Sequence, residues 1–265
     1  MLAELLALKL FVAIAVVLVL TIIAEKMGPK TAGILSGLPT GSAITLFFIG
    51  LQNGTTFASD TAIYNMVGII AMQATLFAYF LASSRLKSNS LPLSALFSLA
   101  AYFLSIYILH LFSFDIFWAV LLPLLSIVAF TYLFKGIEET KIEKPVKLGF
   151  RVLAFRAVVA GIIILIVIEA AGVVGPQWAG LFTAFPTTTF PLILILHHTY
   201  DARHVHTLIK NFPVGLASLV AYSLTVYFAY PLFGIFYGTL AAFAAALAVC
   251  ALIFFFPRKK QSITV

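Results

Sequence analysis

The chain has 265 residues, of which 63% are hydrophobic and only 9% charged, and its formal net charge is +7. Soluble domains carry about 25% charged residues, so this composition excludes an ordinary globular domain and predicts a membrane protein. A helix needs about 20 apolar residues to cross the bilayer, and eight or nine spans would use roughly 160 to 180 residues. Only short loops remain, which leaves no room for a soluble catalytic domain. The single cysteine, Cys250, excludes an internal disulfide.

Apolar runs between charged and turn residues predict an all-α polytopic fold with nine transmembrane helices. Continuous runs of about 20 residues differ from the alternating pattern of an outer-membrane barrel. The expected spans are residues 5–24, 31–50, 62–83, 92–112, 115–135, 150–171, 177–197, 208–229 and 232–256.

The basic residues predict how these spans are oriented, because Lys and Arg concentrate in cytoplasmic loops. With the N-terminus outside, 14 of the 16 basic residues fall on one side, in loops or at the adjoining ends of spans, and none in loops on the other side. We therefore expect a multi-pass protein of the plasma (inner) membrane with its C-terminus in the cytoplasm. The positive charge follows from this topology, so membrane lipid is the expected partner and no nucleic acid is needed to explain it.

An internal repeat appears when the sequence is shifted by 147 residues. Residues 28–40 (GPKTAGILSGLPT) then pair with residues 175–187 (GPQWAGLFTAFPT), with six identities in 13 positions and no gap in the register beyond them. Spans 1–4 correspond to spans 6–9, so we expect the first span to belong to the mature fold. Span 5 adds one crossing and inverts the second copy. The expected units are residues 1–112 (repeat 1), 113–147 (linker helix and cytoplasmic loop) and 148–265 (repeat 2 and basic tail).

Two prolines, Pro39 and Pro186, fall near the middle of spans 2 and 7. Proline lacks an N–H and frees a backbone carbonyl at a depth that bulk water does not reach. Matched breaks of this kind point to a transporter's binding site. The alternative is that the prolines only kink packed helices whose hydroxyls bond to their own carbonyls. The candidate substrate-binding residues, including one mid-depth amide in span 3, are Gly37, Pro39, Thr40, Gly41, Ser42, Gln73, Thr183, Pro186, Thr187 and Thr188.

Two further candidates, Lys9 and Arg156, occupy equivalent positions one to two turns inside spans 1 and 6. Ionisable groups inside a bilayer are candidates for function, and this pair would favour an anionic substrate. The alternative is that both side chains extend to the interface. The sequence holds no HExxH motif, no paired intramembrane aspartates and no Gly-rich phosphate loop. We therefore expect no enzyme activity, no catalytic residue, no metal and no cofactor.

Inverted repeats with broken helices are typical of secondary transporters. We expect alternating access on a small-molecule or anionic substrate that binds at the midplane between the breaks. The alternatives are an ion channel, in which the broken helices form the filter, and a non-transporting membrane subunit for envelope polysaccharide or lipid assembly. The sequence leaves the substrate, the coupling ion and a homo-oligomeric state open.

The segment AGLFTAFPTTTFPLI at residues 179–193, with the polar turn and span that follow it, resembles the small four-helix GlpM-type inner-membrane proteins. The resemblance covers residues 147–257, and AGILSGLPTGSAI at residues 32–44 is similar more weakly. This chain departs from the family by joining two copies through an extra helix. The resemblance implies a four-helix repeat unit and an association with exopolysaccharide (alginate) production.

Overall fold

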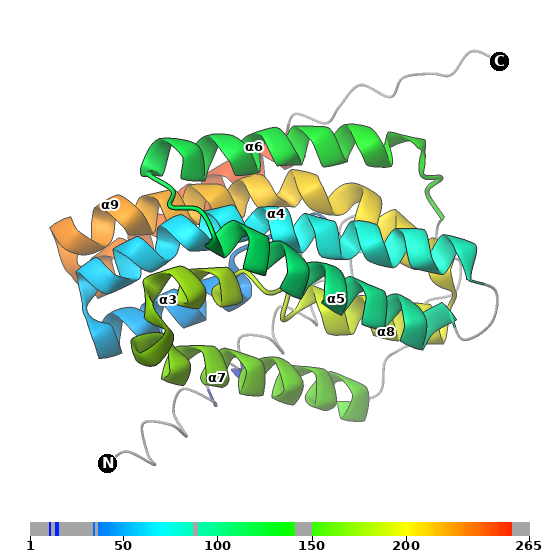
Figure 1. The fold of residues 1–265 in the computed structure, drawn as a ribbon, viewed down its shortest axis with the longest axis horizontal. Coiled ribbons are helices and arrows are strands. Elements are labelled where there is room, and N and C mark those ends of the chain that lie inside the picture. Colours follow the sequence, from blue (N-terminus) through cyan, green and yellow to red (C-terminus); the bar gives the residue numbers. More distant parts are fainter. Residues whose placement is uncertain are drawn as a thin grey trace.

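The computed structural model describes residues 37–86, 90–140 and 150–255, together with Phe11, Ile14, Ala15 and Ile34. Within these residues every regular element is a helix (Figure 1). The first expected span and Lys9 lie outside the described residues, as does the side chain of Arg156. The helices are α3 (Thr40–Asn53), α4 (Thr55–Arg85), α5 (Ser90–His110), α6 (Ile116–Leu133), the short 3-10 helix η1 (Phe134–Gly136), α7 (Phe150–Thr183), α8 (Thr189–Thr199) and α9 (Ala202–Phe255).

Five helical segments are long and apolar enough to cross a membrane: Thr55–Arg85, Ser90–His110, Ile116–Gly136, Ala157–Thr183 and Ala202–Ile253. The chain is therefore a polytopic, all-helical membrane protein, as its composition predicts. The fifth segment has 52 residues, more than twice the roughly 20 that one crossing requires. It contains the expected spans 8 and 9, and the total of nine spans stays a prediction.

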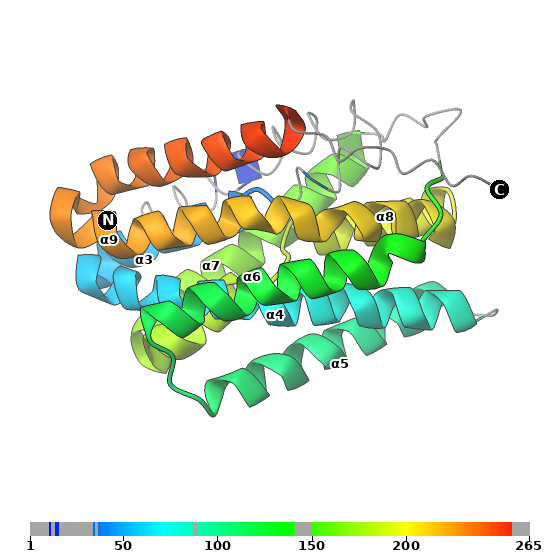
Figure 2. The same cartoon turned by 90° about the horizontal axis from the view of Figure 1, so that it is seen from above.

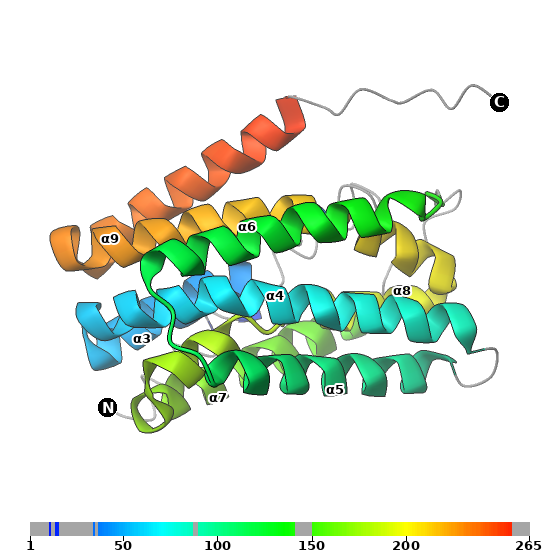
Figure 3. The same ribbon diagram turned by 45° about the horizontal axis from the view of Figure 1, so that its top comes forward.

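Glycines with positive φ turn the chain at three places. Gly54 has φ +92° between α3 and α4, Gly175 has φ +80° within α7, and Gly234 has φ +74° within α9. At Gly234 the helix doubles back, so α9 consists of two limbs that run in opposite directions (Figure 3). Only glycine adopts this left-handed backbone without steric cost. All three turns lie at one end of the bundle, the left end in Figures 1 and 3.

The opposite end of the bundle holds the described basic side chains. Arg85 ends α4, Lys135 lies in η1, and Arg203 and Lys210 lie in the first turns of α9. Lys and Arg mark the cytoplasmic face of membrane proteins. This segregation agrees with the expected orientation, which itself stays a prediction.

The turn from α8 to α9 at this basic end is held by Asp201. Its carboxylate accepts hydrogen bonds from the Arg203 side chain (2.9 Å) and His204 Nδ1 (2.8 Å). Burial raises the pKa of Asp201, but hydrogen bonds from His204 and Arg203 outweigh burial and lower the pKa to about 2. The carboxylate therefore stays ionised at neutral pH and fixes the start of α9.

Helix α4 is the interior helix of the bundle and lies between α5 and α9 (Figure 2). In its most apolar stretch 61% of the residues are buried inside the protein, against 17% to 33% in the other candidate spans. A helix that is apolar all round and buried packs against protein on every side. The other candidate spans turn large apolar faces outward, as helices in contact with lipid do.

Glycines allow helices from distant parts of the chain to cross with their backbones in contact. A Cβ atom on Gly37 would overlap the backbone of Gly215 in α9, and a Cβ atom on Gly68 in α4 would overlap the side chain of Ala184. Small residues at such crossings let transmembrane helices pack closely. The segment before α3 is thereby pressed against α9, and the segment after α7 against α4.

We expect Gly215→Ala to destabilise the protein by about 1–3 kcal/mol, because the new methyl group would overlap the carbonyl oxygen of Ile34. The midpoint of thermal unfolding in detergent should fall accordingly. Gly136→Ala is the control, since no atom lies within 4 Å of its Cβ position, and it should leave the midpoint nearly unchanged. An alanine at Gly215 that unfolds like the native protein would contradict the close crossing.

Candidate functional site

The two prolines mark interruptions between helices in the middle of the bundle. Pro39 immediately precedes α3, while Pro186 lies in the gap between the end of α7 at Thr183 and the start of α8 at Thr189. Neither proline donates a backbone hydrogen bond. The expected span 177–197 is therefore divided at its proline, and the described helix of the expected span 31–50 begins only after Pro39.

The two breaks share one backbone hydrogen-bond pattern. In each, the residue after proline donates to the residue before it, and the proline carbonyl accepts from the amide four residues later. These bonds are Thr40 N to Leu38 O (2.7 Å), Thr187 N to Phe185 O (2.7 Å), Ala43 N to Pro39 O (2.7 Å) and Phe190 N to Pro186 O (2.8 Å). The equal positions within both breaks mean that the local fold is the same.

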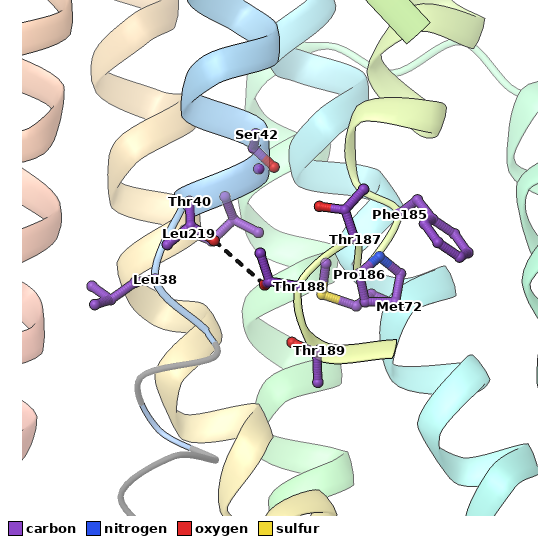
Figure 4. A pocket seen from close by; sticks show the side chains of 11 residues that line it. Leu38, Thr40, Ser42, Met72, Phe185, Pro186, Thr187, Thr188, Thr189 and Leu219 are labelled. Atoms are coloured by element: carbon purple, nitrogen blue, oxygen red, sulfur yellow. Dashed lines mark hydrogen bonds between the residues drawn. The ribbon is translucent and has the colours of Figure 1, made fainter. Parts of the chain in front are cut away.

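A small cavity of about 20 Å³ lies between the breaks (Figure 4). A single water needs roughly 10–15 Å³ by this measure, so the space holds about one water-sized ligand. Eleven residues line it, and ten of them form five pairs whose members are 147 positions apart. The pairs are Leu38 and Phe185, Thr40 and Thr187, Gly41 and Thr188, Ser42 and Thr189, and Met72 and Leu219; Pro186 completes the lining.

Two helices begin at this cavity and run away from it toward opposite ends of the bundle (Figure 1). α3 starts at Thr40 and α8 at Thr189, and no side chain caps either N-terminus. The two starts are linked by Thr40 and Thr188, whose Oγ1 atoms are 3.4 Å apart. Helix N-termini carry partial positive charge, so both helices present their positive ends to the same space.

The backbone carbonyls at the breaks, by contrast, accept hydrogen bonds from the protein itself. Side-chain donors come from α3, α5 and α9, and backbone donors come from the breaks. The bonds are Ser42 Oγ to Thr183 O, Tyr102 OH to Leu181 O, Ser218 Oγ to Gly37 O, and Phe185 N to Phe182 O, besides those to Leu38, Pro39, Phe185 and Pro186 given above. Most of the described carbonyls at the breaks thus accept a hydrogen bond. Ser42 and Ser218 each share their single hydroxyl proton between two acceptors.

A buried side-chain network extends from the cavity toward α9. Besides its bond to Thr183 O, Ser42 Oγ donates to Asn65 Oδ1 at 3.2 Å, and Asn65 Nδ2 donates to Ser223 Oγ at 2.8 Å. Ser42, Asn65 and Ser223 are at most 5% exposed. Hydrogen bonds between helices fix their mutual positions in a medium that offers no competing water.

The remaining candidates fall at different places. Gly37 and Pro39 are buried at the first break, Gly37 against α9. The Thr183 hydroxyl donates to Ala179 O in its own helix at 2.7 Å. This is the arrangement expected if the hydroxyls near the prolines only bond to their own helices. Gln73 lies outside the cavity lining: its Nε2 donates to Ser126 Oγ in α6 at 2.6 Å, and its buried Oε1 has no partner within the described chain.

Met72 and Leu219 line the cavity although sequence reasoning did not select them. Ser218, which donates to the Gly37 carbonyl next to the cavity, was not selected either. A signal for Met72 and Leu219 was available, because they are 147 positions apart and Met72 adjoins the polar Gln73. Apolar lining residues carry no chemical signature, so only the register of the repeat marks them.

Histidines near the basic end have protein partners. His197 Nδ1 lies 2.7 Å from Tyr79 OH, and His206 Nε2 lies 2.8 Å from Ser83 Oγ. Within the described residues no group of three or more His, Cys, Asp or Glu side chains is arranged to hold a metal ion.

Comparison of the chain with protein-family models, curated proteins and solved structures gives no match. The resemblance to GlpM-type proteins therefore stays a prediction.

Ser42→Ala should lower the free energy of unfolding in detergent micelles by about 1 kcal/mol. It removes the donor that serves two buried acceptors, Asn65 Oδ1 and Thr183 O, and interhelical hydrogen bonds average about 0.6 and reach about 1.7 kcal/mol. Ser84→Ala is the matched control, since Ser84 is exposed and bonds back to Phe80 O in its own helix. Equal losses in the two variants would show that the buried network contributes nothing specific.

Proposed function

We propose that the protein is a secondary transporter that works by alternating access, with its substrate bound between the breaks at Pro39 and Pro186. In this proposal two inverted four-helix repeats, joined by α6, move relative to each other around the site. The N-terminus lies outside and the C-terminus in the cytoplasm. The substrate is a small molecule or anion that the breaks enclose.

The bounds of the helices support the repeat. α4 begins at Thr55 and α9 at Ala202, 147 residues later. α3 and α8 each begin within three residues after a proline. α3 ends just before α4, and α8 ends just before α9, the counterpart of α4. The second limb of α9, after Gly234, then corresponds to α5. A shared order of elements is what a duplicated unit requires.

Reciprocal contacts support a two-fold relation between the repeats. Around a two-fold axis, a contact between residue i of one copy and residue j of the other recurs with the two copies exchanged. Three such contacts recur at the shift of 147. They are Gly37–Gly215 with Ala184–Gly68, Ile34–Gly215 with Leu181–Gly68, and Thr40–Thr188 with Thr187–Gly41.

The observation that carries the proposal is the cavity on this axis. Its lining consists almost wholly of pairs related by the repeat, so exchanging the conformations of the two repeats would leave the same residue types around it. A site on the symmetry axis of inverted repeats stays in place while access to it alternates. With space for about one water, the cavity is narrow in this conformation, and the proposed cycle would have to widen it to admit a larger substrate.

Cysteine accessibility tests the proposal, in a background in which Cys250 is replaced by serine. Thr40→Cys and Thr187→Cys line the cavity from opposite repeats. We expect each thiol to react with a membrane-impermeant reagent from both faces over time, because the proposed site opens to each side in turn. Reaction from one face should be slowed in conditions that speed reaction from the other.

Three control variants calibrate the labelling. Thr56→Cys and Ser84→Cys are exposed at opposite ends of α4 and should react quickly from one face each, whereas Thr75→Cys is fully buried and should not react. Thr40→Cys and Thr187→Cys that stay unreactive in every condition would refute transport in favour of a packed assembly subunit. Simultaneous, uncorrelated access from both faces would indicate a channel.

A further inference from the structure

We infer that the cavity between the breaks is a binding site for a small monovalent anion, held by the N-terminal amides of α3 and the hydroxyl of Thr187 and favoured by the positive end of α8. The inference rests on the proposed function only for the role of the cavity in transport. The binding chemistry follows from the donors and acceptors around the cavity.

The first argument is the direction of the two helices. α3 and α8 have 14 and 11 residues, and both begin at the cavity. A helix N-terminus is equivalent to roughly half a positive charge, carried by its free N–H groups. In the first turn of α8, Phe190 N already donates to Pro186 O and Pro191 has no N–H. The amide donors that face a ligand therefore come from α3, and the dipole of α8 adds to the positive potential without any charged side chain.

The second argument is which backbone groups are left. Several carbonyls at the breaks accept protein donors, among them Thr183 O from Ser42 and Gly37 O from Ser218. The amides of Gly41 and Ser42, in the first turn of α3, donate no hydrogen bond within the described chain. A cation needs oxygen ligands that are not already engaged, whereas an anion needs donors. The cavity offers donors.

The third argument is the hydroxyl of Thr187, which points into the space between the two breaks (Figure 4). Thr187 is only 5% exposed, lines the cavity, and its Oγ1 has no hydrogen-bond partner in the part of the chain that the structure describes. This oxygen is accessible from the cavity space, so a bound acceptor would receive its hydrogen there. Gly41 makes room for it, because a Cβ atom there would overlap Thr187 Oγ1.

Charge and size narrow the class of ligand. No Asp, Glu, Lys or Arg is among the described residues that line the cavity. Burial of charge without a counter-charge is expensive and the cost grows with the charge, which excludes divalent anions. The volume of about 20 Å³ fits a ligand close to a water molecule in size, which points to a halide or a similarly compact anion.

The test is anion-dependent stability of the purified full chain in detergent, with sodium bromide replaced stepwise by sodium gluconate at constant ionic strength. We expect the midpoint of thermal unfolding to rise and saturate with bromide, because a ligand that binds only the native state stabilises it. Sulfate should give no such saturation. Replacing sodium by choline should change nothing, and adding a neutral polyol should change nothing either.

Two variants locate the site. Thr187→Val and Gly41→Ala should raise the half-saturating bromide concentration at least about tenfold, as loss of a hydrogen bond to a charge predicts. Thr225→Val is the control, because that hydroxyl bonds back to Ala221 O and is no part of the cavity lining, and it should keep the native concentration. Unfolding in gluconate alone shows whether each variant is folded.

Several results would overturn the inference. They are stabilisation that follows the cation or the polyol, no dependence on anions, and equal half-saturation in native protein, Thr187→Val and Gly41→Ala. The cysteine experiment separates this failure from failure of the transport proposal. If access to the cavity alternates but no anion binds, the anion site is refuted and the transport proposal stands. If bromide binds but the cavity is reached from one face only, transport is refuted and the anion site stands.

Discussion

The need to satisfy backbone groups at a helix break within the bilayer organises this protein. Lipid offers no hydrogen bonds, so every carbonyl freed near Pro39 or Pro186 requires a donor from the protein. Tyr102 of α5 serves the end of α7, and Ser218 of α9 serves the segment before α3. These donors tie α5 and α9 to the breaks. The arrangement of the bundle around α4 is in this sense a consequence of the two interruptions.

Close packing is the second consequence of the same constraint. A serine reaches a carbonyl in a neighbouring helix only if the backbones nearly touch, and Ser218 reaches Gly37 O because Gly37 and Gly215 have no side chains at their contact. At the second break Ala184 packs in the same way against Gly68, where a Cβ atom would overlap its side chain. The missing side chains of the glycines let the helices approach, and the Ser218 hydroxyl, about one turn after Gly215, reaches the neighbouring carbonyl.

The sequence predicts much of this arrangement, and its failures have a physical cause. Proline position and the shift of 147 residues predict where α3 and α8 begin. The same shift relates the apolar pair Met72 and Leu219, which the sequence analysis did not select. The outward or inward direction of Gln73 was not predictable, because α4 is apolar all round and its periodicity selects no face. The doubling back of α9 at Gly234 follows from a left-handed backbone, which an isolated glycine permits but does not require.

Departures from symmetry carry information that the repeat alone does not. The buried amide Asn65 corresponds to Phe212 in the second repeat, and Ser223 corresponds to Leu76 in the first. The network from Ser42 through Asn65 to Ser223 therefore exists only once. If the two repeats exchanged conformations, this network would have no equivalent, and the two states would differ in free energy. Because a ligand shifts such an equilibrium only by its difference in affinity for the two states, the binding site must differ between them as well. Gly41 and Thr188 hold equivalent positions at the cavity but differ in side chain, and this provides the difference between the two states.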